Sequence, residues 1–220
     1  MTKQRMLSSV LVALMLAVAL GTSSASELKG RVSVPKGKGP AVVFLKGVKG
    51  GSLPKADAVI THVSGGKFEP AVTVGFVGND FVFRNEDDTL HTTHLYLHLA
   101  YQKEISGRPI ENGATLYNIA LPMKGMEVHR PIKGYHRFDD DTGVIDVRCN
   151  PHPGESAAAL VFDHPFATIA GDDGSFSIAD VPAGKHDVWV WIAGEAKKWK
   201  SVDVKASGTT NVLLELDEEH

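Results

Sequence analysis

Short hydrophobic segments rich in Val, Ile, Phe and Thr recur along most of the chain, and Gly, Pro and Asp separate them. Regular spacing of such segments is typical of β-sandwiches, and no segment shows a convincing helical period of 3.6 residues. The pattern therefore predicts an all-β protein. The expected strands are Leu28 to Val34, Ala41 to Lys46, Ala58 to His62, Ala71 to Phe76, Phe81 to Arg84, Val144 to Arg148, Ala158 to Phe162, Ser175 to Ile178, Asp187 to Ile192, Ser201 to Val204 and Thr210 to Leu216.

The first 25 residues follow a different pattern. Lys3 and Arg5 precede an apolar run from Val10 to Leu20, and the small residues Ser23-Ser24-Ala25 come next. This order is typical of a secretory signal peptide, and the apolar run is shorter than the roughly 20 residues that a membrane span needs. We expect the mature protein to begin near Ser26 in the periplasm or outside the cell. No cysteine lies at the cleavage site, so we expect no lipid anchor.

Two distant segments resemble parts of one small β-sandwich. Residues 28–48, together with the segment after residue 164, resemble carboxypeptidase regulatory-like domains, which are transthyretin-like sandwiches. The turn residues Asp173-Gly174 and Pro182-Ala183-Gly184 precede strand-like segments, as hairpins require. We expect residues 26–52 to supply the first strands of this sandwich, residues 53–163 to form an inserted domain, and residues 164–220 to complete the sandwich. One continuous sandwich with additional C-terminal strands is the alternative.

The charge of the chain excludes some classes of partner. After residues 1–25 are removed, 195 residues remain, with 21 Lys and Arg against 26 Asp and Glu, a net charge near −5. An acidic chain is a poor match for nucleic acid or an anionic membrane surface. It is compatible with docking onto a basic redox protein.

Cys149 is the only cysteine of the chain, so an intramolecular disulfide is impossible. It lies in the segment Cys-Asn-Pro-His-Pro-Gly-Glu, three residues before His152, and His91 lies upstream behind a strand-like segment. One thiolate and two imidazoles form a ligand set that suits copper. Cys149 alone is also consistent with a small buried hydrophobic residue, but convergent cysteine and histidine residues indicate a metal site.

Two segments around the candidate ligands follow one recognisable pattern. The first is Lys67-Phe68-Glu69-Pro70, then Gly78-Asn79-Asp80-Phe81-Val82-Phe83-Arg84-Asn85, then His91. The second is the strand Val144 to Arg148 followed by the loop from Cys149 to Pro153. In this order the two segments resemble the two halves of plastocyanin-like cupredoxins, and the resemblance implies a Greek-key β-sandwich with copper bound by His91, Cys149 and His152. It also implies single-electron exchange with a redox partner protein, which makes an electron carrier the expected role rather than an enzyme.

The axial copper ligand departs from the family pattern. The resemblance places a methionine three residues after the second histidine, and this chain has Glu155 there. A carboxylate favours Cu(II) and lowers the reduction potential. The other candidates for this position are Met123, Met126, His94 and a water molecule. An open position would suit a copper-handling protein or small-molecule binding, and a metal-free interaction module is a third hypothesis.

The region from Tyr101 to Thr142 has weak strand signals, and we interpret it as a long loop that is either functional or mobile. We expect His129 and His136 to be exposed in this loop. The run Asp139-Asp140-Asp141 lacks the pattern of a calcium-binding loop, so we expect a solvated turn. Trp189 and Trp191 alternate along one strand and are expected to pack in a core or between domains.

Overall fold

The computed structural model describes residues 26–34, 37–97, 114–134 and 144–215, and these residues form sixteen β-strands. The expected signal peptide, His136 and the three-aspartate run lie outside the described residues. Within the described part, no helix is long and apolar enough to cross a membrane. The expected all-β fold class is confirmed.

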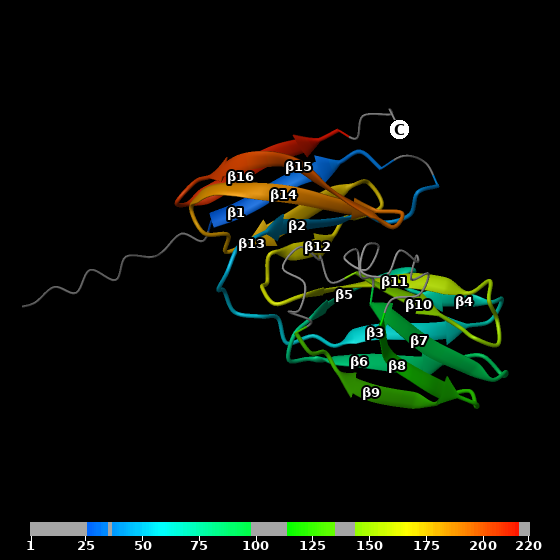
Figure 1. Cartoon of the computed structure of the whole chain (residues 1–220). Helices are drawn as coiled ribbons and strands as arrows, with labels where there is room; N and C mark the ends of the chain where they lie inside the picture. The colour runs from blue at the N-terminus through cyan, green and yellow to red at the C-terminus, as the bar shows by residue number, and fades with distance from the viewer. Residues whose placement is uncertain (1–25, 35–36, 98–113, 135–143, 216–220) are drawn as a thin grey trace, which may run out of the picture.

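One group of seven strands combines the two ends of the described chain in a pair of sheets (Figure 1). A three-stranded sheet has the order β13-β1-β16, and a four-stranded sheet has the order β12-β2-β14-β15. β1 pairs in parallel with β16, so an N-terminal strand and a C-terminal strand lie side by side. The bounds are β1 Ser26–Val32, β2 Val42–Lys46, β12 Ala167–Ile169, β13 Ser175–Ala179, β14 Gly184–Ile192, β15 Glu195–Val204 and β16 Gly208–Leu214.

The nine strands between β2 and β12 form the second pair of sheets, which carries the candidate metal ligands. One sheet has the order β4-β3-β6-β9 and the other has the order β5-β11-β10-β7-β8. The bounds are β3 Ala58–Val63, β4 Lys67–Glu69, β5 Val72–Phe76, β6 Asp80–Asn85, β7 His91–Leu97, β8 Ala114–Leu121, β9 Glu127–Pro131, β10 Val144–Arg148 and β11 Ser156–Phe162.

The connections of this second sandwich repeatedly cross from one sheet to the other. β6 leads to β7 in the opposite sheet, β8 returns to β9, and β9 leads back to β10. β3 and β6 pair in parallel, as do β5 and β11, while β10 pairs antiparallel with both β7 and β11. This Greek-key arrangement places β10 beside β7, so the residues at the ends of these two strands meet.

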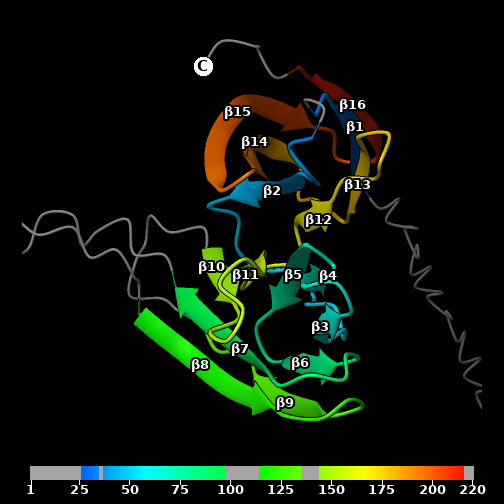
Figure 2. The ribbon, with the colours of Figure 1, turned by 90° about the vertical axis from the view of Figure 1, so that its right-hand side faces the viewer.

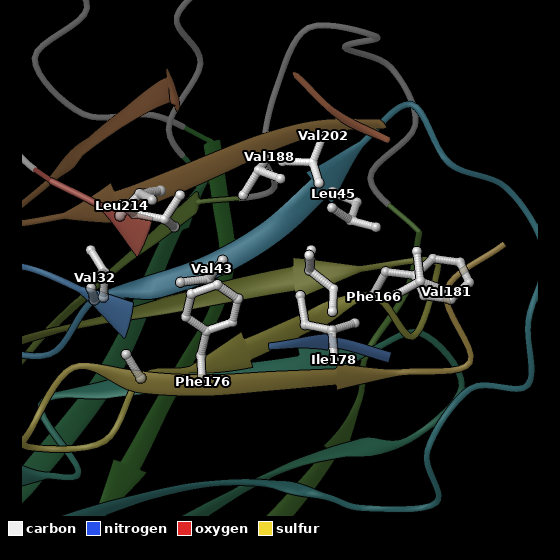
Figure 3. Packing of buried hydrophobic residues seen from close by; sticks show 14 of the residues in the cluster. Val32, Val43, Leu45, Phe166, Phe176, Ile178, Val181, Val188, Val202 and Leu214 are labelled. Atoms are coloured by element: carbon white, nitrogen blue, oxygen red, sulfur yellow. The ribbon is translucent and has the colours of Figure 1, made fainter. Parts of the chain in front are cut away.

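Each sandwich has a hydrophobic core because side chains alternate between its interior and its surface. Figure 3 shows the core of the first sandwich, where Phe176 and Ile178 of β13 lie together with Leu214 of β16 and with Phe166, which directly precedes β12. The core of the second sandwich includes Cys149, which is 1% exposed.

A third buried cluster joins the two sandwiches. Its members are Val42, Phe44, Val72, Phe76, Leu160, Phe162, Ala167 and Trp191.

The structure corrects the interpretation of residues 101–142 as one long loop. β8 and β9 occupy residues 114–121 and 127–131, and each pairs along its length with a neighbouring strand. Both strands lie at sheet edges, where outward-facing side chains meet water, so polar residues such as Asn118 on β8 and Glu127 on β9 interrupt the hydrophobic pattern. His129 therefore lies on β9 rather than in a loop, and it is exposed as expected.

Candidate metal centre

The loop after β10 carries three of the expected ligands within seven residues. β10 ends at Arg148, Cys149 follows, and β11 begins at Ser156. The Glu155 amide donates to the His152 carbonyl at 2.9 Å, and the Cys149 amide donates to the Glu155 carbonyl at 3.4 Å. Pro151 restricts the backbone of the same loop. These contacts fold the loop back on itself, so the side chains of Cys149, His152 and Glu155 face a common point.

His91 reaches that point from the first residue of β7, and Asn85 fixes the turn before it. The Asn85 amide nitrogen donates to the carbonyls of Thr89 at 2.9 Å and Leu121 at 2.8 Å. Its side-chain oxygen accepts the Asp87 amide at 2.8 Å. Asn85 is fully buried, and it satisfies three backbone groups that would otherwise lack partners. The turn that Asn85 stabilises between β6 and β7 thus determines where β7 begins and where His91 points.

The four side chains expected to bind metal converge. His91 Nδ1 lies 3.6 Å from Cys149 Sγ and 3.2 Å from His152 Nδ1, and Cys149 Sγ lies 3.4 Å from His152 Nδ1. The Glu155 carboxylate lies 3.2 Å from His91 Nδ1 and 3.3 Å from His152 Nδ1. Tetrahedral bonds of about 2.0–2.1 Å to nitrogen and about 2.3 Å to sulfur separate two nitrogens by about 3.3 Å and nitrogen from sulfur by about 3.6 Å. One metal ion therefore fits among the four side chains.

The second nitrogen of His91 is held on the side away from this point. His91 Nε2 lies 3.1 Å from Asp87 Oδ2 and 3.0 Å from Thr89 Oγ1. Carboxylates lie beside both ring nitrogens, Asp87 beside Nε2 and Glu155 beside Nδ1. A proton on Nε2 is donated to Asp87, and this tautomer leaves the Nδ1 lone pair for a metal ion. The hydrogen bond with His91 lowers the pKa of Asp87 to about 2. Asp87 is thus a charged acceptor that fixes the orientation of the His91 ring.

Cys149 is buried and contacts β7. The Thr92 amide donates to Cys149 Sγ at 3.5 Å, and Thr92 Oγ1 accepts the Asn150 amide at 2.9 Å. Burial raises the pKa of the Cys149 thiol. A metal ion must therefore displace a proton from this sulfur when it binds. The Thr92 contacts hold the sulfur in place beside His91.

The structure adds one histidine that the sequence analysis missed. His62 lies on β3 and is fully buried, and its Nδ1 is 3.1 Å from Glu155 Oε2. Its ligand atoms lie within 4.8 Å of those of His91, Cys149 and Glu155. Burial lowers the pKa of His62 to about 4. One signal was present in the sequence, because His62 continues the inward-facing series Ala58 and Ile60 along β3.

The other candidates lie outside this cluster. His94 is buried, and its two ring nitrogens lie 3.1 Å from Asn150 Oδ1 and 3.0 Å from Thr115 Oγ1. Met123 is 64% exposed, and Met126 packs against the hydrophobic core of the sandwich. Glu155, in contrast, is 4% exposed. Its carboxylate oxygens lie 3.2 Å from His91 Nδ1 and 3.3 Å from His152 Nδ1, which are separations expected between ligand atoms of one metal ion.

Comparisons with known proteins gave structural likenesses alone: no family model and no curated protein matches the chain. An oxidized mutant of amicyanin is 16% identical, with 58% of this chain and 95% of that chain covered and a TM-score of 0.33. A copper-containing nitrite reductase from Thermus scotoductus SA-01 is 17% identical over 54% of this chain and 25% of that chain, with a TM-score of 0.32. A purple cupredoxin from Nitrosopumilus maritimus is 16% identical over 49% of this chain and 99% of that chain, with a TM-score of 0.30. These likenesses are too distant to say what the present chain binds, and its function is inferred below from the geometry of the site.

Proposed function

We propose that the mature chain is an exported copper protein of cupredoxin type that accepts and donates single electrons. His91, Cys149, His152 and Glu155 would hold the metal, and copper would supply the one-electron redox couple. One observation carries the proposal. A cysteine sulfur, two imidazole nitrogens and a carboxylate lie within the separations of a single coordination sphere at the end of a β-sandwich.

The chemistry of the donor atoms favours copper. Thiolate sulfur is a soft ligand that suits Cu(I), and imidazole suits both copper oxidation states. A tetrahedral set of sulfur and nitrogen also accepts zinc, so metal content has to be measured on protein purified without added metal. The carboxylate of Glu155 is a harder donor than a thioether and favours Cu(II).

The fold keeps the ligands in fixed positions, as single-electron exchange requires. Cys149 and His91 are each 1% exposed; Cys149 directly follows the end of β10, and His91 begins β7. Their hydrogen bonds to Thr92 and Asp87 restrict both side chains further. Little rearrangement is then needed when Cu(I) and Cu(II) interchange.

In this proposal, electrons pass between the metal and a partner protein through the exposed edge of His152. Its side chain is 38% exposed, whereas Glu155 is 4% exposed. We propose that a redox partner protein docks at this face of the sandwich, in the periplasm or outside the cell. The net charge near −5 of the mature chain would complement a basic partner.

Voltammetry of the copper-loaded protein tests this proposal. We expect residues 26–220 to give a reversible one-electron wave that disappears in Cys149→Ser. His129→Ala is the matched control, because it removes an exposed histidine on β9 that lies outside the cluster. Loss of copper from the wild type during each reduction would contradict electron transfer as the function.

An exchangeable copper site is the second candidate, and the exposed edge of His152 favours it. Such a site would bind azide and would release copper rapidly to a chelator. A visible spectrum that azide changes in the wild type, together with rapid copper release, would support this candidate over the electron carrier.

A further inference from the structure

A buried histidine partners the carboxylate of the metal site. His62 lies on β3, in the sheet opposite the Cys149 loop, and none of its surface is exposed. Its Nδ1 lies 3.1 Å from Glu155 Oε2, and its Nε2 lies 3.0 Å from Thr93 Oγ1. Glu155 is itself 4% exposed. A carboxylate that is removed from water in this way needs donors that replace the lost water molecules.

The chemistry of the two groups assigns the direction of the hydrogen bonds. Ionised Glu155 only accepts, so His62 Nδ1 carries the proton and donates to Oε2. The neutral ring then accepts at Nε2, so the Thr93 hydroxyl donates to this nitrogen. A protonated Nδ1 has no free lone pair to offer a metal ion.

Two neighbouring rings pack against His62 and restrict its orientation. The ring lies 4.3 Å from the Phe68 ring and 4.4 Å from the His91 ring, measured between centroids. Gly66, in the turn between β3 and β4, lies against Glu155: a Cβ at Gly66 would be 3.6 Å from Oε1. The β3–β4 hairpin therefore packs directly against the Glu155 carboxylate.

We propose that His62 is a positioning residue of the metal site, which holds the Glu155 carboxylate toward the ion through its Nδ1 proton. This inference rests on the proposed copper function and extends the site to a residue in the other sheet. His62 is not a metal ligand in this account. The hydrogen-bonding partners of ligating carboxylates change metal affinity by about 10- to 100-fold when they are removed.

A double-mutant cycle between His62 and Glu155 tests the inference. Cu(II) affinity would be measured by competition with a chelator for the wild type, His62→Leu, Glu155→Met and the double variant. We expect His62→Leu to weaken Cu(II) binding about 10- to 100-fold in the wild type. In the Glu155→Met background it should change the affinity by no more than about twofold, because the carboxylate through which His62 acts is gone.

His62→Asn is the conservative variant, because an amide N–H can replace the Nδ1 donor. We expect it to recover most of the affinity lost in His62→Leu and to restore the thiolate-to-copper charge-transfer spectrum of the wild type. The circular dichroism of each metal-free variant checks that the sandwich is folded.

The outcomes separate this inference from the function on which it rests. Equal losses of affinity from His62→Leu in both backgrounds would overturn it, since His62 would then act as a ligand or as a packing residue. An unchanged affinity and spectrum in His62→Leu would also overturn it while leaving the copper function intact. A wild type without a thiolate-to-copper band would contradict the proposed function, and the role of His62 with it.

Discussion

At the scale of single residues, the buried carboxylate of Glu155 distinguishes the proposed site from one completed by a methionine thioether. Its oxygens lie 3.2 Å from His91 Nδ1 and 3.3 Å from His152 Nδ1, and one of them accepts a hydrogen bond from His62. A thioether at this position would be neutral and soft, whereas a carboxylate places negative charge beside the metal position and stabilises the more highly charged Cu(II). In the proposed copper site, substitution of this residue should therefore change the reduction potential while the three other proposed ligands stay in place.

Glu155→Met tests the effect of the carboxylate. We expect the variant to bind copper and to have a higher reduction potential, because the preference for Cu(II) is reduced. Each tenfold change in the ratio of affinities for Cu(II) and Cu(I) shifts a one-electron potential by about 59 mV, and we expect a rise of at least this size. A redox titration of wild type and variant measures it, and an equal or lower potential in the variant would show that Glu155 does not influence the metal.

Asn85→Ala tests the turn that positions His91. Asn85 bonds three backbone groups in a buried setting, so the substitution leaves these groups without partners. We expect the metal-free protein to lose about 1–3 kcal/mol of unfolding free energy, measured by urea denaturation. Asn118→Ala, at an exposed position on β8, should change it by no more than about 0.5 kcal/mol. Similar effects of the two substitutions would contradict this role of Asn85.

At the scale of elements, the strands with strong hydrophobic alternation could be predicted from the sequence, whereas the edge strands β8 and β9 could not. Val144–Arg148 forms β10 with the predicted bounds, because apolar residues face the core and the flanking residues favour turns. β9 has only exposed and half-buried positions, so its hydrophobic signal is weak. Strands of this kind form because a neighbouring strand supplies hydrogen-bonding partners, which the local sequence does not encode.

The same distinction applies to the candidate site. Cys149, His152 and Glu155 share one loop, so their spacing indicates a common centre, and His91 follows a recognisable strand and turn. His62 contacts Glu155 across 93 positions of sequence. No local spacing relates the two residues, and their contact depends on how the two sheets face each other.

Gly30→Ala tests the packing of β1 against its neighbours. A Cβ at Gly30 would overlap the Val212 carbonyl of β16 and lie 2.7 Å from the Phe176 ring of β13. Overpacking of this kind costs about 1–3 kcal/mol, and we expect urea denaturation of the metal-free protein to show a loss of this size. Lys29→Ala is the control at the adjacent exposed position and should cost at most about 1 kcal/mol, the upper value for an exposed ion pair. A neutral Gly30→Ala variant would contradict the close approach of the three strands.

At the scale of the whole molecule, the two sandwiches share a buried aromatic contact. Phe44 of β2 and Phe162 of β11 have ring centroids 5.2 Å apart, and Trp191 of β14 belongs to the same cluster. The views in Figures 1 and 2 show β2 and β12 next to β5 and β11, where the sandwiches meet. We propose that residues 53–163 are a domain inserted into the other sandwich, and that this cluster makes the two unfold together.

Trp191 tests the contact between the sandwiches. Its Nε1 is buried and has no hydrogen-bonding partner among the described residues. Trp191→Phe removes this unpaired donor and keeps a ring, so we expect its effect on the unfolding free energy to stay within about 1.5 kcal/mol. Trp191→Ala removes the ring and should cost about 3–5 kcal/mol. Thermal and urea denaturation of both variants would contradict the account if Trp191→Ala were as stable as the wild type.

The visible spectrum of the Cu(II)-loaded protein tests the central claim, that Cys149 binds copper together with His91 and His152. Titration of residues 26–220 with Cu(II) should produce an intense thiolate-to-copper charge-transfer band that saturates at one equivalent. Cys149→Ser should lack the band, and His129→Ala should retain it. A wild type without the band, or a Cys149→Ser variant that binds Cu(II) as tightly as the wild type, would contradict the account.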